Sequence, residues 1–243
     1  AFTAVDDAEN NKKINKIINE TIPGKIAVET KKLNALLIHF STDYVYSGIG
    51  KKPWTEKNKM IPKNYYGLSK SKGDKSIINS GCNFIILRSS WIYSSNGKNF
   101  LNTMINLAKN KKSIHVINDQ VGTPTSAFLL VKATDEIIKD YFNNKESSKF
   151  LNNTFHLAPK GFVSWHGFSL EILNYLEKHN IKTKLKKENV ISVNSKQYRQ
   201  KARRPLNSRL NTNKAKKMFD LKFLPWQEEL HQILNLKLEN NIL

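Results

Sequence analysis

Short apolar runs that alternate with amphipathic segments constrain the fold of this chain more than any other feature of its sequence. Three runs are typical of buried parallel strands and a fourth is weaker; they cover residues 35–40, 84–87 and 114–117, and residues 154–157. Six segments have the apolar periodicity of helices and cover residues 25–33, 66–78, 100–109, 126–141, 164–179 and 225–238. Strands that alternate with helices predict an α/β fold with a mainly parallel sheet.

The second part of the chain differs from the first. Beyond about residue 150, fewer stretches have the apolar pattern of a strand. Residues 182–204 are polar and basic and have no continuous apolar periodicity, which predicts a loop with a short strand. We expect residues 1–150 to form the main part of the sheet with its helices. Residues 151–243 would form a smaller, mainly helical lobe that adds part of the sheet and covers the carboxyl ends of its strands, where ligands of open α/β sheets bind.

The charge of the chain bears on its partners. The formal net charge is +20, from 40 Lys and Arg against 20 Asp and Glu. A nucleic-acid-binding module is therefore one alternative, but the lysines are dispersed and form no block of roughly five or six. We expect neither a nucleic acid nor a membrane as partner, and a positive field that attracts an anionic substrate. One cysteine, Cys82, and no apolar stretch of about 18 residues predict a reducing, cytoplasmic compartment.

Two motifs carry candidate chemistry. Ser41, Thr42 and Asp43 directly follow an apolar strand, and polar residues at the carboxyl end of a buried parallel strand lie where active sites form. The alternative is a turn or a helix cap. Tyr66 and Lys70 are four residues apart on a predicted helix, so the phenol and the ammonium share a face, and the positive charge would lower the pKa of the phenol. The alternative is an ordinary amphipathic helix surface.

The two motifs, in this order, are similar to the active-site layout of extended short-chain dehydrogenases. Within that group the chain resembles the dTDP-4-dehydrorhamnose reductase family, because residues 41–46, Ser-Thr-Asp-Tyr-Val-Tyr, are similar to the family's STDYVF signature. Further stretches agree in order and spacing and cover residues 1–6, 87–93, 99–108, 119–126, 155–158 with 164–165, and 204–210. The resemblance extends over essentially the whole chain.

The resemblance implies a fold, a reaction and a catalytic set. The fold would be a Rossmann-like, doubly wound parallel sheet, in which residues 1–150 form the carboxy-terminal part of the NAD(P)-binding domain and residues 151–243 form the substrate-binding lobe. The reaction would be the reduction of the 4-keto group of dTDP-4-dehydro-6-deoxy-L-mannose to dTDP-L-rhamnose, used in cell-surface polysaccharide, with NADPH or NADH. Tyr66 would donate the proton to the developing alkoxide. Lys70 would lower the pKa of Tyr66 and hold the nicotinamide ribose, and Thr42 would hydrogen-bond the keto oxygen.

Further site residues follow from the same resemblance. Residues that would border the cofactor, besides Tyr66 and Lys70, are Ala1, Phe2, Thr3 and Phe40. Residues that would contact the nucleotide sugar, besides Thr42, are Asp43, Trp91, Gln120, Thr123 and Arg209. The alternatives are a core position for Trp91, loop hydrogen bonds for Gln120 and Thr123, and a surface ion pair for Arg209.

The chain also departs from the family. Relatives begin with a strand and a Gly-rich turn that binds the cofactor pyrophosphate, and here the stretch similar to the family's AAYTAVD lies at residue 1. We therefore expect a sheet that lacks its first strands, and poor dinucleotide binding and low stability for residues 1–243 alone. In addition, Ser47 stands where relatives usually carry Asp.

Two further expectations concern metals and alternatives. The six histidines have no metal-ligand spacing, and no acidic cluster matches the Mg²⁺ site of some relatives, so we expect no metal. A homodimer is compatible with the resemblance. The alternatives to an active reductase are a non-catalytic binding protein, similar to the regulatory subunit of methionine adenosyltransferase, and an inactive fragment.

Overall fold

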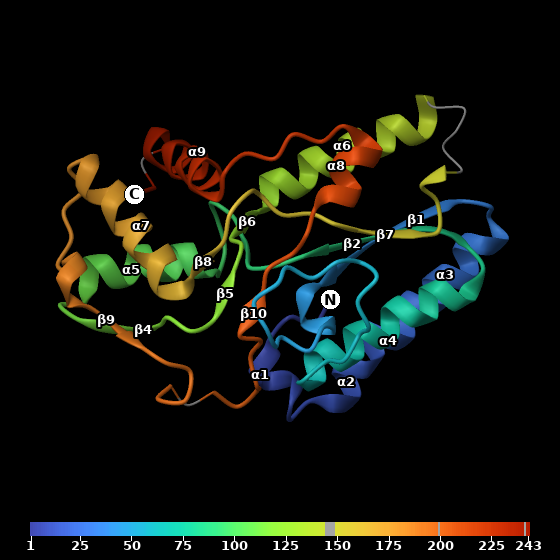
Figure 1. Cartoon of the computed structure of the whole chain (residues 1–243), viewed down its shortest axis with the longest axis horizontal. Coiled ribbons are helices and arrows are strands. Elements are labelled where there is room, and N and C mark those ends of the chain that lie inside the picture. The colour runs from blue at the N-terminus through green and yellow to red at the C-terminus, as the bar shows by residue number, and fades with distance from the viewer. Residues whose placement is uncertain (144–148, 199, 241) are drawn as a thin grey trace. The chain divides into compact units, whose positions relative to one another are not determined.

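The computed structural model describes residues 1–143, 149–198, 200–240 and 242–243, and the chain forms two compact units. The first unit comprises Ala1–Ser89, Ala133–Leu157 and Gln200–Leu221, and the second comprises Ser90–Lys132, Ala158–Arg199 and Lys222–Leu243. The division expected after residue 150 does not coincide with these units, because each is assembled from separate stretches of chain. Figure 1 labels most of the helices and strands of both.

A parallel sheet organises the first unit. It contains β1 (Leu36–Thr42), β2 (Asn83–Ser89) and β7 (Asn153–His156) in the order β1-β2-β7. Both pairs are parallel, and the β1–β2 register runs from Leu36 opposite Asn83 to Thr42 opposite Ser89. The three strands lie within two residues of the ranges that the sequence predicted, which confirms the parallel α/β class for this unit.

Helices pack on the sheet because their apolar side chains meet those of the strands. Ala27, Ile77 and Cys82 form one cluster with Phe84 and Ile86 of β2, and all five side chains are buried. The cluster includes residues of α3 (Ile22–Lys32) and α4 (Tyr65–Ser80), which run side by side in Figure 1. The other elements of this unit are α1 (Val5–Ala8), α2 (Lys12–Lys16), the π-helix η1 (Ile17–Thr21), the 3-10 helix η2 (Asp43–Val45), β10 (Asn207–Ser208) and α8 (Asn213–Phe219).

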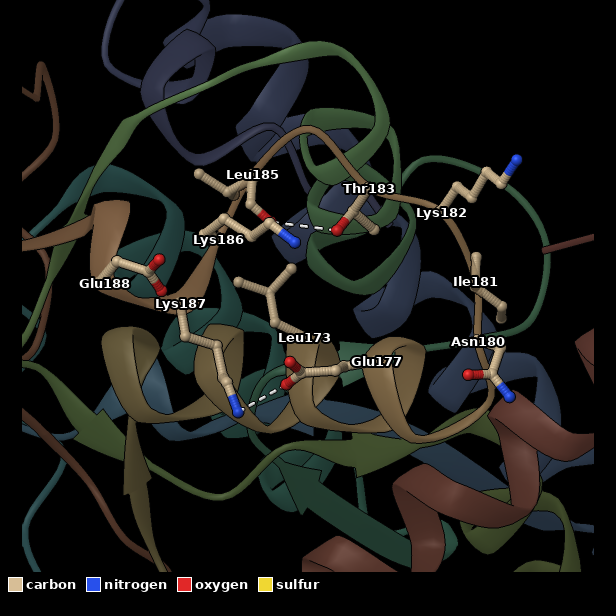
Figure 2. A pocket seen from close by; sticks show the side chains of 10 residues that line it. All are labelled: Leu173, Glu177, Asn180, Ile181, Lys182, Thr183, Leu185, Lys186, Lys187 and Glu188. Carbon is tan, nitrogen blue, oxygen red and sulfur yellow. Dashed lines mark hydrogen bonds and ion pairs between the residues drawn. The ribbon is translucent and has the colours of Figure 1, made fainter.

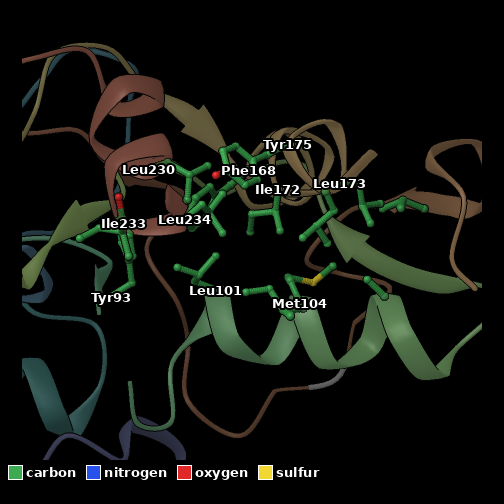
Figure 3. Packing of buried hydrophobic residues seen from close by; sticks show 14 of the residues in the cluster. Tyr93, Leu101, Met104, Phe168, Ile172, Leu173, Tyr175, Leu230, Ile233 and Leu234 are labelled. Carbon is green, nitrogen blue, oxygen red and sulfur yellow. The ribbon is translucent and has the colours of Figure 1, made fainter. Parts of the chain in front are cut away.

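The second unit is built around three helices, α5 (Phe100–Asn110), α7 (Trp165–Lys178) and α9 (Trp226–Glu239). Figure 3 shows Leu101 and Met104 of α5 pointing toward Ile172 of α7, in a cluster whose labelled members are all buried. The α7 helix begins where the sequence predicted, since the Ser164 side chain accepts a hydrogen bond from the backbone N–H of Gly167.

Short strand pairs complete the second unit. Two pairs are parallel: β4 (Ile114–Ile117) with β9 (Val190–Val193), and β3 (Ile92–Tyr93) with β6 (Thr125–Ser126). One pair is antiparallel, β5 (Val121–Gly122) with β8 (Val163–Ser164). The 3-10 helix η4 (Lys187–Asn189) precedes β9, so the predicted loop with a short strand is confirmed. The helix α6 (Ala127–Asn143) contributes residues to both units. No helix in the described ranges is long and apolar enough to cross a membrane.

Candidate active site

Thr42, Tyr66 and Lys70, the three predicted catalytic residues, all lie in the first unit, where β1 ends and α4 begins. A side-chain hydrogen bond joins Thr42 to the phenol of Tyr66. The Thr42 hydroxyl also donates to a carboxylate oxygen of Asp43 at 3.2 Å and accepts the backbone N–H of Tyr44 at 3.2 Å. The strand end therefore presents a fixed hydroxyl to the phenol.

Local sequence fixes the start of α4. The Asn64 side chain caps the helix by accepting the backbone N–H of Gly67 at 2.8 Å. Gly67 is required for close packing, because a Cβ at this position would lie 2.2 Å from the carbonyl oxygen of Tyr44. The first turn of α4 can thus approach the turn after β1, which brings Tyr66 to Thr42.

Lys70 is buried, with 2% of its surface exposed. Its ammonium donates to the Phe40 carbonyl oxygen at 2.7 Å and lies 3.1 Å from Nε2 of His39. Burial lowers the pKa of Lys70, and the charge of Asp74 acts in the opposite direction. The Lys70 amine is therefore held against β1 by two acceptors on adjacent residues.

The pKa of Tyr66 corrects one expectation. We expected Lys70 to lower it, but it is raised, above all by burial, with the negative charge of Asp43 adding to the effect. The hydrogen bond with Thr42 lowers it only in part. The physical reason is that the ammonium is directed at Phe40 and His39, while the phenol loses water on burial.

Asp43 brings a carboxyl group next to these residues. It is 3% exposed, and burial raises its pKa from 3.8 to about 7, although hydrogen bonds with Ser208 and Thr42 lower it. At neutral pH the carboxyl group is therefore divided between its protonated and ionised forms. This position suits contact with a sugar hydroxyl, which can donate to or accept from it.

Two residues that the sequence analysis left without a role anchor the neighbourhood of Tyr66. The guanidinium of Arg204 donates to a carboxylate oxygen of Asp6 at 2.8 Å and to the Tyr44 hydroxyl at 3.2 Å. The Tyr44 ring meets the Tyr66 ring edge-on, with centroids 5.5 Å apart. Both Arg204 and Asp6 lie in stretches that resemble the family, and this resemblance is the sequence signal that could have identified them.

Asn19, which the sequence analysis did not single out, holds the backbone of Phe2. It is 1% exposed, in the π-helix η1, and its amide group makes reciprocal hydrogen bonds with the backbone of Phe2, at 2.8 and 2.9 Å. It donates further to the Ser69 hydroxyl at 3.3 Å. Phe2 is therefore tied to α4 beside Lys70. A π-helix has no clear periodicity in a sequence, although such bulges are frequent at functional sites.

The other residues predicted to contact the cofactor are exposed to solvent. Ala1 and Thr3 are exposed, and Phe40 has 45% of its surface exposed although it lies within β1. Phe40 thus offers an apolar side chain to solvent and a carbonyl oxygen to Lys70. A role for these residues in cofactor binding stays a prediction.

The remaining predicted substrate residues are divided between the units. Arg209, in the first unit, donates to the Asn207 side chain at 3.0 Å. In the second unit, Trp91 stacks on Trp165 with ring centroids 3.5 Å apart, and the Thr123 hydroxyl donates to the Gly161 carbonyl at 3.0 Å. Gln120, also in the second unit, is 4% exposed. Their part in substrate binding stays a prediction.

A separate pocket of about 430 Å³ lies beside the end of α7 in the second unit (Figure 2). Across it, the Lys187 ammonium and the Glu177 carboxylate form an ion pair at 2.7 Å. None of its lining residues is among the predicted site residues. In the described ranges, no group of three His, Cys, Asp or Glu side chains is placed to hold a metal ion.

Comparisons with known proteins give one consistent family. Residues 1–238 match the family described as RmlD substrate binding domain. The dTDP-4-dehydrorhamnose reductase of Shigella flexneri is 37% identical over 235 residues, which cover 97% of this chain and 77% of the relative.

Solved structures agree with this match. A dTDP-4-dehydrorhamnose reductase from Clostridium acetobutylicum has a TM-score of 0.84 at 30% identity, over 97% of this chain and 78% of that one. The dTDP-4-dehydrorhamnose reductase from Bacillus anthracis, in complex with NADP, has a TM-score of 0.81 at 31% identity, over 96% of this chain and 77% of that one.

Proposed function

The chain belongs to the family of dTDP-4-dehydrorhamnose reductases, and on this premise we propose that Tyr66, Thr42 and Lys70 form its catalytic centre. The reaction is the NAD(P)H-dependent reduction of the 4-keto group of dTDP-4-dehydro-6-deoxy-L-mannose to dTDP-L-rhamnose. One observation carries the assignment of residues. The Thr42 hydroxyl, at the carboxyl end of a parallel strand, shares a hydrogen bond with the Tyr66 phenol, and the buried ammonium of Lys70, four residues later on the same helix, donates to that strand.

Tyr66 acts as the proton donor. Because its pKa is raised, the phenol carries its proton at neutral pH and can transfer it to the oxygen that becomes negative during reduction. Thr42 shares a hydrogen bond with the same phenol, so its hydroxyl is placed to bind that oxygen as well. The pair orients the carbonyl and stabilises the developing charge.

Lys70 fits the ribose of a nicotinamide cofactor. An ammonium has three N–H donors, and here two of them face the Phe40 carbonyl and His39. The third suits a ribose hydroxyl, and the exposed Phe40 side chain and Phe2 suit the apolar parts of the cofactor. When bound, the reduced cofactor supplies two electrons as a hydride. Lys70 therefore holds the ribose.

Several residues support binding of the nucleotide sugar. Asp43 and Arg209 offer a carboxyl group and a guanidinium in the first unit. In the second unit, Trp91 has a backbone φ of 50°, in the left-handed region, and stacks on Trp165. A strained backbone at a non-glycine residue is a frequent mark of a functional site. We assign Trp91 to the substrate on this basis and on the family resemblance, and Gln120 and Thr123 on the resemblance alone.

A spectrophotometric assay tests the proposal. The protein, given dTDP-4-dehydro-6-deoxy-L-mannose and NADPH at a concentration high enough to offset the poor dinucleotide binding expected from the sequence, should oxidise the cofactor and form dTDP-L-rhamnose. Tyr66→Phe should lower kcat by about 100-fold or more, because general acid catalysis contributes about that factor. Its circular dichroism should match that of the unsubstituted chain. A chain that binds NADPH but never turns over would instead be a non-catalytic relative. A homodimer, a cytoplasmic location and the roles of residues 1–150 and 151–243 stay predictions.

A further inference from the structure

His39 occupies a position that none of the roles above explains. It lies on β1, directly before Phe40, and its Nε2 atom is 3.1 Å from the Lys70 ammonium. The Phe40 carbonyl accepts from the same ammonium at 2.7 Å. Two consecutive residues of one strand therefore hold the amine of Lys70 from two directions.

Asp74 lies one helical turn after Lys70 on α4 and is also close to His39. One oxygen of its carboxylate, Oδ2, accepts from the Ser41 hydroxyl at 2.9 Å and from Nη2 of Arg88 at 2.9 Å. The other oxygen, Oδ1, has no hydrogen-bond partner among the described residues and lies 3.7 Å from Nε2 of His39. Nε2 of His39 is thus close to both the Lys70 ammonium, at 3.1 Å, and the free oxygen of Asp74, at 3.7 Å.

The charge state of His39 follows from these neighbours. Burial and the positive charge of Lys70 lower the pKa of His39 to about 4, and the negative charge of Asp74 opposes them. The imidazole is therefore neutral at neutral pH. An ammonium is only a donor, so Nε2 must be the unprotonated nitrogen and Nδ1 must carry the hydrogen.

We propose that His39 is a positioning residue for Lys70: its neutral imidazole accepts a hydrogen bond from the ammonium and fixes the remaining N–H donor toward the cofactor. This inference rests on the proposed role of Lys70. Without His39, only the Phe40 carbonyl would hold the amine. Lys70 could then turn toward the free Asp74 oxygen and form an ion pair that withdraws it from the ribose.

A double-mutant cycle tests the coupling between the two residues. His39→Leu should lower kcat/KM for NADPH at least tenfold, mainly through KM. His39→Gln should stay within about threefold, because its amide oxygen still accepts the hydrogen bond. In a Lys70→Met background, His39→Leu should change kcat/KM less than twofold. His115→Leu, on an exposed histidine of β4, serves as the control and should leave the kinetics unchanged.

Nuclear magnetic resonance of the His39 ring gives a readout that does not depend on activity. In the unsubstituted protein, Nδ1 should carry the hydrogen, and the pKa of His39 should rise when Lys70→Met removes the nearby positive charge. An Nε2–H tautomer, a pKa insensitive to Lys70→Met, or an equal loss from His39→Leu in both backgrounds would overturn the proposal. If Lys70→Met left turnover intact, the role of Lys70 in the reaction would fail instead, while the ring measurements would still report the contact.

Discussion

Arg88 on β2 donates two hydrogen bonds to a single carboxylate oxygen of Asp74 on α4, at 2.9 and 3.1 Å. Both side chains are almost fully buried, with 3% and 0% exposed. Arg88 also donates to the Tyr46 hydroxyl at 2.8 Å, which lies 2.7 Å from Nε2 of His156. Asp74 lies one helical turn after Lys70, and the guanidinium of Arg88 neutralises its negative charge. The two residues belong to a buried polar network that joins the sheet to α4.

Removing one partner of this pair should be costly. We expect Arg88→Met to lower the free energy of unfolding by about 3–5 kcal/mol, because it leaves a buried carboxylate without its counter-charge. Urea denaturation measures the change. Lys139→Met, which removes the exposed ion pair with Asp135, is the matched control and should cost less than about 1 kcal/mol. Equal effects of the two substitutions would contradict the importance of the buried pair.

Asp43 predicts a specific pH dependence of stability. Its pKa is raised from 3.8 to about 7 in the folded protein, so the folded state binds this proton more tightly than the unfolded state. The resulting stability is fully present below pH 3.8 and is lost as the pH rises through about 7.

Asp43→Asn should therefore become more stable relative to the unsubstituted protein as the pH rises from 4 to about 7, with no further gain above that range. Thermal unfolding of both proteins across this range measures the difference. His39 and His156 have lowered pKa values and act in the opposite direction, but their effects cancel in the comparison. A difference that stays constant with pH would show that Asp43 ionises normally.

Gly73 is needed where α4 crosses the π-helix. A Cβ at this position would lie 2.1 Å from the carbonyl oxygen of Asn19. Glycine to alanine in a helix normally gains about 0.5–1 kcal/mol. Here we expect Gly73→Ala to lose more than about 1 kcal/mol instead, and to raise KM for NADPH because Asn19 holds Phe2. Lys75→Ala, on the exposed side of the same helix, is the control. A stabilised Gly73→Ala protein would contradict this packing.

Much of the fold could be predicted from the sequence because it depends on local periodicity. The same periodicity puts Tyr66 and Lys70 on one helix face and Thr42 at a strand end, whereas the approach of Tyr66 to Thr42 was expected from the family resemblance. Tertiary features could not be predicted. The π-helix around Asn19 has no sequence periodicity, and the interleaving of the two units depends on long-range packing.

The direction of the Tyr66 pKa was missed for a similar reason. The spacing of Tyr66 and Lys70 indicates proximity on a helix, but the sequence does not show that the ammonium turns toward β1. Nor does it show that the phenol loses its water. When a group is buried, the loss of solvation can outweigh a charge one helical turn away.

Asn15 and Asn19 are both buried and lie one helical turn apart. Their replacement by alanine should nevertheless have opposite effects on stability. The Asn19 amide makes hydrogen bonds with Phe2 and Ser69, whereas neither polar atom of the Asn15 side chain has a partner among the described residues. A buried amide without partners costs about 1–3 kcal/mol. We therefore expect Asn15→Ala to raise the melting temperature without changing kcat, and Asn19→Ala to lower both. If Asn15→Ala is destabilising, its amide must bind a group such as a water molecule, which crystallography at high resolution would reveal.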